Sequence, residues 1–216
     1  MTRLAERSLV LVAAAAELAV SLEDARRFCE VAEGDSSPDG LLRDLLIPAA
    51  IEASQEYTGR QWVNATYDLT LDRFPRQGSG PCAPRRPAIV VPRSPLVSVT
   101  YLKHVDEAGV LQTVDAADYK ALTAKMPGQV EPAFGKTWPA ERDEGDAVTL
   151  RFVAGHGADA SSVPYRARLG MLQAIATWFA HRERFVTGTI ATTLPERAMD
   201  TLSPLCLRGF PELEEE

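Results

Sequence analysis

The sequence predicts an α+β fold in which a small α-helical bundle carries a β-rich insertion of short antiparallel strands. Helical periodicity is found near both ends of the chain, whereas the stretch between alternates apolar and polar residues and is rich in Val, Thr and Tyr. A β block with helices on both sides is most simply an insertion into a bundle. We therefore assign 1–62 and 160–216 to the bundle and 63–159 to the insertion, together forming one structural unit.

The N-terminal stretch LVLVAAAAELAV follows Arg3 and Arg7 and loosely imitates a secretory signal peptide. We expect a buried strand or an extended arm leading into the first helix instead, because nothing downstream is typical of an extracellular protein. The three cysteines are odd in number and no pair has metal-ligand spacing, which fits a reducing compartment. No apolar run reaches the roughly 18 residues of a membrane span, so we expect no membrane partner.

Two helices are predicted before the β block. The first, SLEDARRFCEVA, begins at Ser21, which is a good N-cap. The second runs roughly from Leu41 to Tyr57 and ends before Gly59. Its apolar residues share one face: Leu42, Leu45, Leu46, Ala49, Ala50, Ala53 and Tyr57. Pro48 lies within this stripe, so we expect one kinked helix rather than two.

The β block is predicted from short alternating runs: WVNATYDLTLDRF, AIVV, LVSVTYLKHVD, VLQTVD and AVTLRFVAG. DEAG, between the third and fourth runs, has the composition of a hairpin turn. Two long loops, 75–87 and 132–146, are expected to interrupt the strands.

Helical periodicity returns after Pro164. The predicted apolar stripe contains Leu169, Leu172, Ile175, Ala176 and Phe179, widened by Met171 and Trp178, and ends near Arg184. Pro195 is well placed to open a short last helix through Leu202, since proline suits the first turn of a helix. The chain ends in an acidic stretch, ELEEE.

The search for catalytic motifs favours a binding or structural role. The sequence contains no G-x-S-x-G, no P-loop and no G-x-G-x-x-G, and its histidines, His104, His156 and His181, stand in no metal-binding pattern. An acidic run at 141–146 has the wrong spacing for an EF-hand. We expect no catalytic residue, no metal and no cofactor. The alternative is a small hydrolase-like enzyme using His156, which lies between two glycines in RFVAGHG.

The charge balance bears on contact with nucleic acid. The formal net charge is −7, and a broad hold on phosphates needs a basic surface. A DNA-binding module is therefore disfavoured. An acidic surface would instead keep DNA from adhering to a wall along which it slides.

A particular order of short motifs runs along the chain. SLEDARRFCEV is followed by TGR leading to LTLDRFP, then by PRSPLVSV and GKTWP, and last by RFVAGHG with VP, Trp178 and RE. This order resembles the head–tail connector (adaptor) proteins of long-tailed phages and of phage-derived gene transfer agents, from about Leu9 to Leu207. Three features depart from the family: Pro48 within a helix, His156 where an aromatic residue is frequent, and the length of loop 75–87.

The resemblance implies a virion structural protein without catalysis. Copies of such a protein form a homo-oligomeric ring of about a dozen under the portal protein, closed by a heterologous contact. The ring extends the DNA channel, through which DNA passes without specific binding. It also provides the docking surface for the next tail-side protein, a stopper or tail terminator. The implied location is the head–tail junction of the virion, and the host cytoplasm during assembly.

Two surfaces are expected to make these contacts. The C-terminal stretch is predicted to dock on the portal, because it has more apolar residues than a free tail would carry: Leu202, Leu205, Leu207 and Phe210. A ring or tail-side interface is predicted at Phe134 and Trp138, since a loop tryptophan is a frequent interface anchor. Arg85 and Arg86 are added to this interface, although a solubilising loop is the commoner interpretation of such a pair.

Overall fold

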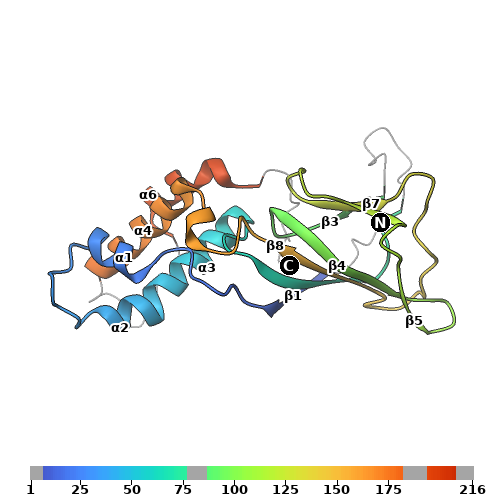
Figure 1. The fold of residues 1–216 in the computed structure, drawn as a ribbon, viewed down its shortest axis with the longest axis horizontal. Helices are drawn as coiled ribbons and strands as arrows, with labels where there is room; N and C mark the ends of the chain where they lie inside the picture. Colours follow the sequence, from blue (N-terminus) through green and yellow to red (C-terminus); the bar gives the residue numbers. More distant parts are fainter. Residues whose placement is uncertain (1–6, 77–86, 182–193, 208–216) are drawn as a thin grey trace. The chain divides into compact units, whose positions relative to one another are not determined.

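The computed structural model describes residues 7–76, 87–181 and 194–207, which divide into two compact units. The β unit takes the described parts of 1–14 and 64–155, and the helical unit takes those of 15–63 and 156–216 (Figure 1). The expected α+β class and the helical bundle with a β insertion are thus present. The expected boundary is wrong at the N-terminus, because Arg7–Ala13 forms a strand of the β unit instead of belonging to the bundle.

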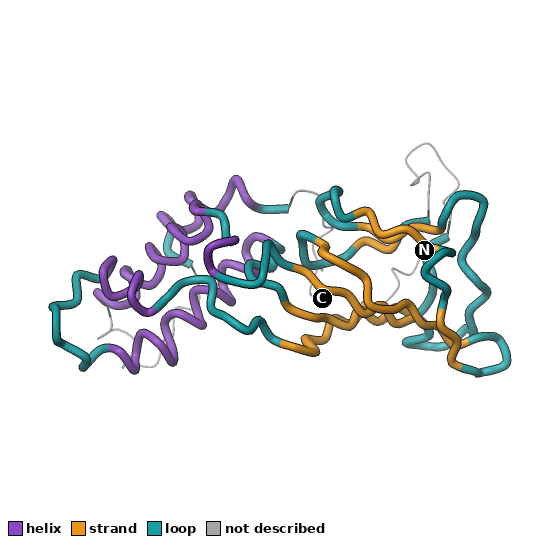
Figure 2. The backbone as a smooth tube through the Cα atoms, in the orientation of Figure 1, coloured by secondary structure: helices purple, strands orange, loops and turns teal. Residues whose placement is uncertain are grey.

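The β unit contains a five-stranded and a three-stranded antiparallel sheet, and Figure 2 shows its strands in two layers. The larger sheet has the order β1 (Arg7–Ala13), β2 (Ala65–Leu71), β8 (Val148–Ala154), β4 (Leu96–Val105) and β5 (Leu111–Thr113). The smaller sheet has the order β3 (Ile89–Val90), β7 (Gln129–Pro132) and β6 (Tyr119–Leu122). The predicted hairpin at DEAG joins β4 to β5.

The facing sides of the two sheets form the core of the β unit. β2 and β8 alternate buried and half-buried residues along their whole length, as the alternating sequence predicts. Their buried residues, such as Leu69 and Leu150, join Ile89 and Val130 of the smaller sheet in one apolar cluster. The alternation in the sequence is therefore the alternation between the inner and outer faces of the larger sheet.

A polar row crosses the outer face of the larger sheet. Asp68 in β2 lies opposite Arg151 in β8, which lies opposite Tyr101 in β4. The Arg151 guanidinium donates two hydrogen bonds to Asp68, at 2.8 and 2.7 Å, and lies 4.9 Å from the centroid of the Tyr101 ring. A forked ion pair and a cation–π contact in one row fix the register of three strands.

The helical unit consists of segments from both sides of the insertion. These are α1 (Leu22–Phe28), α2 (Asp39–Leu41), a π-helical turn (Leu42–Leu46), α3 (Ile47–Thr58), α4 (Tyr165–Ala180) and α6 (Glu196–Leu202), with short 3-10 turns at Ala160–Ser162 and Ser203–Leu205. Their buried side chains form a second apolar cluster around Trp62, Met171 and Ile175. No helix in the described ranges is long and apolar enough to cross a bilayer.

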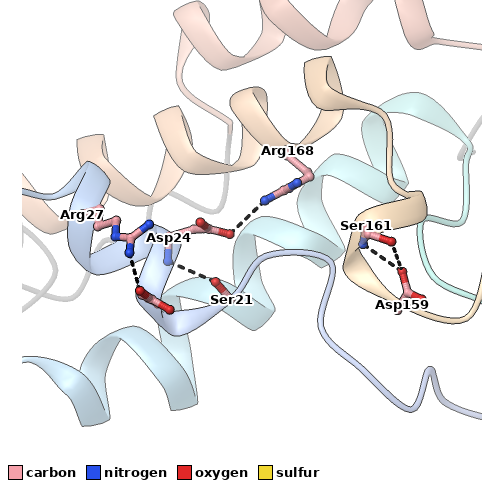
Figure 3. Close-up of polar contacts among 7 residues, drawn as sticks. Ser21, Asp24, Arg27, Asp159, Ser161 and Arg168 are labelled. Carbon is pink, nitrogen blue, oxygen red and sulfur yellow. Dashed lines mark hydrogen bonds and ion pairs between the residues drawn. The ribbon is translucent and has the colours of Figure 1, made fainter.

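Local signals in the sequence account for the helix ends. The Ser21 hydroxyl accepts a hydrogen bond from the Asp24 N–H at 3.0 Å, which caps α1 as expected (Figure 3). Figure 3 also shows Arg168 of α4 reaching Asp24, at 2.9 Å. The predicted helix around Pro48 is continuous, and the π-helical turn ends at Leu46, two residues before this proline. A π turn suits this place because proline has no N–H to donate to the preceding turn.

The buried face of α4 differs from the predicted stripe. Leu169 is exposed, and small residues form much of the buried face: Ala167, Gly170 and Ala174, with Met171, Ile175 and Trp178. The reason is the last helix, whose Leu202 side chain lies directly against the Gly170 backbone. Hydrophobic periodicity cannot find such a face, because the close approach requires residues that contribute little hydrophobicity.

We predict that Gly170→Ala lowers the free energy of unfolding by up to about 2 kcal/mol. A Cβ at residue 170 would lie 2.7 Å from the Leu202 Cγ, and Leu202 is fully buried, so it has no space in which to move aside. Overpacking costs about 1–3 kcal/mol, which exceeds the roughly 1 kcal/mol that alanine gains over glycine within a helix. Urea unfolding followed by circular dichroism measures the difference.

The matched control is Gly40→Ala in α2, where the nearest atom to an added Cβ is 4.0 Å away. This variant should be as stable as the parent protein or more stable. Stabilisation of equal size by both substitutions would contradict the packing of Leu202 on Gly170.

Candidate functional site

The stretch RFVAGHG ends β8 and leads back to the helical unit. Gly155 has φ +147°, and a Cβ there would lie 2.5 Å from the Asn64 Oδ1 and 2.6 Å from the Asn64 Cα. Its N–H donates to the Pro95 carbonyl at 3.0 Å. The glycine is therefore required by a close approach between two backbone segments. The stretch RFVAGHG is an ordinary strand end.

His156 is held against Trp62. The two rings stack with centroids 5.9 Å apart and planes 20° apart, and the His156 N–H donates to the Trp62 carbonyl at 3.0 Å. The Trp62 side chain is fully buried and donates from Nε1 to the Ser54 hydroxyl at 2.8 Å. His156 thus forms part of a packed corner of the helical unit.

The electrostatics of His156 match this packing. Burial lowers the pKa of the imidazole, and the nearby Arg60 guanidinium lowers it further, so the ring is held neutral. Its Nε2 is buried and has no hydrogen-bond partner among the described residues. A general base must reach the proton that it removes, and this nitrogen faces no described nucleophile.

The described residues contain no group of three His, Cys, Asp or Glu side chains that could hold a metal ion.

The C-terminal residues predicted to dock on a portal are divided by the structure. Leu202 is a core residue with no exposed surface, so its side chain has no area left for a partner. Leu205 and Leu207 are half-buried, and Phe210 lies outside the described residues. Docking through Leu205, Leu207 and Phe210 stays a prediction.

The segment that carries Leu205 and Leu207 is fastened to the end of α3. The Arg60 guanidinium donates to the Leu205 carbonyl at 2.5 Å, and the Leu207 N–H donates to the Thr58 carbonyl at 3.0 Å. Leu207 also covers Gly59, which ends α3 with φ +69°. The last described residues, up to Leu207, are therefore held against the end of α3.

The loop predicted to form an interface contains two aromatic residues with different environments. Trp138 is half-buried: its ring stacks on Phe74 with centroids 4.9 Å apart, and its Nε1 donates to the Pro87 carbonyl at 2.7 Å. Phe134 is 98% exposed. Trp138 therefore anchors the loop within its own chain, and Phe134 is the residue presented outward. Arg85 and Arg86 lie outside the described residues.

Phe134 is displayed on a turn with several fixed points. The Ala133 N–H donates to the Asp118 carbonyl at 2.9 Å, and the Lys136 N–H donates to the Ala133 carbonyl at 3.0 Å. The Lys136 ammonium pairs with the Asp118 carboxylate at 2.8 Å. A phenylalanine exposed on an ordered turn is a better interface anchor than a mobile one, because less conformational entropy is lost on binding.

The sequence reasoning missed two further surfaces, which are the two edges of the larger sheet. In β1, Val10 and Leu11 are 54% and 51% exposed. In β5, Leu111 is 61% exposed, and Val110, directly before it, is 54% exposed. The signal in the sequence was the unbroken apolar run LVLV, which was expected to be a buried strand or an arm. From Ser8 to Ala13 this end strand has no proline and no charge, which are common protections against strand pairing.

We predict that His156→Phe flattens the pH dependence of stability below about pH 6.5. The pKa of His156 is lowered in the folded protein, so below the ordinary histidine pKa of about 6.5 the unfolded chain binds more protons. The stability contributed by the neutral ring is therefore present above that pH and is lost as the pH falls. Thermal unfolding from pH 5 to 8 tests this, and an unchanged slope in the variant would contradict it. His104, whose pKa is also lowered by burial, retains part of the slope.

No protein-family model matches the sequence, and no curated protein matches it significantly. Solved structures do match. A chain in the neck of an empty GTA particle, computed with C6 symmetry, has a TM-score of 0.72 and 22% identity over 94% of this chain and 97% of that one. A chain in the virion of a native gene transfer agent (GTA) particle has a TM-score of 0.70 and 23% identity, over 94% and 96%. A chain in the neck of a native GTA particle, computed with C12 symmetry, has 0.67 and 22%, over 94% and 97%. Over nearly its whole length, this chain has the fold of chains found in GTA particles and their necks.

Proposed function

We propose that this protein is a virion structural protein, a head–tail adaptor that forms a ring under the portal. The observation that carries the proposal is the similarity of fold, over 94% of the chain, to chains of GTA necks. Because that similarity covers the bundle and the insertion together, it supports a common role for the whole chain. The ring would extend the DNA channel and give the next tail-side protein, a stopper or tail terminator, its docking surface.

The symmetry of the similar structures supports a ring of identical copies. The two necks were computed with C6 and C12 symmetry. Rotational symmetry above twofold requires a heterologous interface, in which two different surfaces of each copy meet. The ring of copies would lie at the head–tail junction of the virion, and the copies would assemble in the host cytoplasm.

The alternative, a small hydrolase-like enzyme using His156, has weaker support. The imidazole of His156 is packed against Trp62, and burial lowers its pKa. Its buried Nε2 faces no described nucleophile. The apolar surface on both sheet edges and at Phe134 favours assembly instead. A net charge of −7 agrees with a channel wall that repels DNA.

The proposal predicts that the full chain, mixed with the portal protein of its particle, forms rings stacked on the portal in negative-stain electron microscopy. A variant ending at Leu207 keeps α6 and the contacts of Leu205 and Leu207, but lacks Phe210 and the acidic end. It should keep the melting temperature of the full chain and bind the portal more weakly.

Absence of rings on the portal with the full chain would contradict the adaptor function. Undiminished binding by the variant ending at Leu207 would contradict only the docking role of Phe210. A variant ending at Leu194 is a poor test, because it also removes Leu202 from the core of the bundle.

We predict that Phe134→Ser reduces ring assembly or tail-side docking about tenfold or more while leaving the melting temperature unchanged. The side chain is 98% exposed, so its removal costs the monomer little, whereas a buried phenylalanine at an interface contributes about 1.5–3 kcal/mol. Assembly is measured by analytical ultracentrifugation and electron microscopy.

The matched control is Trp138→Phe in the same loop. It removes the hydrogen bond to the Pro87 carbonyl but keeps an aromatic ring beside Phe74, so we expect a loss of about 1 kcal/mol in stability and normal assembly. Normal assembly and tail docking in Phe134→Ser would show that Phe134 is not an interface residue.

A further inference from the structure

β1 is one of the two edge strands of the larger sheet, and its outer edge is apolar and open. β1 pairs with β2 and has no other partner strand among the described residues. Its regular part ends at Leu11, where the register shifts before Ala13. Val10 and Leu11 are neighbours in a strand and so point to opposite faces, yet both are about half exposed. The backbone groups and the side chains on both faces are therefore accessible to another strand.

The other end of the same sheet has the same character. β5 pairs only with β4 among the described strands, and its three residues are all exposed. The hairpin turn before it is held by the Asp106 carboxylate, which accepts hydrogen bonds from the Val110 N–H at 2.9 Å and the Gln112 Nε2 at 2.8 Å. From Val110 to Thr113 the edge carries no charge and no proline. β5 is thus a second ordered edge without the usual protection against strand pairing.

We propose that these two edges are the two halves of one interface between copies: β5 of one protomer adds to β1 of the next and continues the larger sheet around the ring. The proposal rests on the ring assembly proposed above. A closed ring needs two different surfaces on each copy, and the sheet supplies two edges that lie at its opposite ends. An unpaired edge can be completed only by another extended strand, and each copy offers one such strand to each neighbour.

The strand directions agree with rotational symmetry. Every neighbouring pair in the order β1-β2-β8-β4-β5 is antiparallel, so the first and fifth strands run in the same direction. A small rotation about a ring axis preserves strand direction, so β5 would meet the next β1 in parallel. A twofold dimer through β1 alone would instead pair that strand with itself in antiparallel fashion. The two arrangements differ in which residues come close.

The experiment uses two full-length proteins with Cys29, Cys82 and Cys206 replaced by Ala. One carries Leu11→Cys and the other Leu111→Cys, both at exposed positions. Each protein alone and an equal mixture are assembled with the portal and treated with a short bis-maleimide. We expect a covalent dimer containing one copy of each variant in the mixture, and no dimer from either variant alone.

A second measurement probes the energetics of the edges. Leu11→Lys and Leu111→Lys should each raise the protein concentration needed for ring formation about tenfold or more, because an apolar contact is lost and a charge must be desolvated. The matched variants Leu11→Val and Leu111→Val keep an apolar strand former and should assemble normally. All four should have the circular dichroism spectrum and melting temperature of the parent, since these side chains are half exposed.

The outcomes separate this inference from the proposed function. Rings on the portal without the mixed cross-link, or with normal assembly of both Lys variants, would overturn the edge pairing and leave the adaptor function standing. A dimer formed by the Leu11→Cys variant alone would also overturn it, in favour of β1 pairing with itself. Absence of rings from the parent protein would overturn both proposals.

Discussion

The fold depends on holding together the two ends of the longer segment of the β unit, residues 64–155. The chain enters the β unit after Val63 and leaves it after Gly155, so the two crossing segments must lie side by side. In the β unit, β2 and β8 pair with Ala65 opposite Ala154. In the helical unit, His156 stacks on Trp62 and donates its N–H to the Trp62 carbonyl. A histidine held neutral suits this position, since burial and the nearby Arg60 guanidinium both lower the pKa of the imidazole.

The same constraint explains how a bundle can be built from two distant parts of the sequence. The first helices alone leave an open apolar face, and α4 and α6 complete it after the insertion. Because Gly170 has no side chain, Leu202 packs directly on its backbone and α6 approaches α4 closely. The C-terminal segment then returns to the end of α3 through the Thr58 carbonyl and Arg60. Contacts of such long sequence separation form only when the whole bundle folds, which ties the last residues of the described chain to its first helices.

Sequence reasoning found the features that depend on neighbouring residues. These include the Ser21 cap, the helix that continues through Pro48, the β4–β5 turn, and the alternation in β2 and β8. It missed features that depend on distant partners. β6 and β7 are four-residue strands, and the second contains Pro132, so their pairing partner defines them more than their composition does. The role of Leu202 was likewise invisible, because an apolar residue in a C-terminal stretch suits a core as well as a partner.

The candidate surfaces illustrate the same limit in a different way. Sequence reasoning placed Phe134 and Trp138 together at an interface, but burial separates them: one ring stacks on Phe74 and the other is exposed. The apolar run LVLV suggested a buried strand because composition records hydrophobicity but not the number of neighbours. An end strand exposes both faces and one row of backbone groups, and only the strand order reveals this.

Open apolar edges are a cost to a protein that works alone, since they invite aggregation. In a closed ring built by the proposed pairing the cost disappears, because each β5 edge pairs with the β1 edge of the next copy and none stays open. In a sheet with an odd number of antiparallel strands, the two edge strands run in the same direction. When such a sheet is repeated by rotation, the edge strands that meet at the junction therefore run in parallel. An even number would set the end strands antiparallel to each other, so that a rotated copy would present the opposite strand direction at the junction. For a continuation by rotation about a ring axis, the five-stranded order of this sheet therefore makes the junction between β5 and the next β1 parallel.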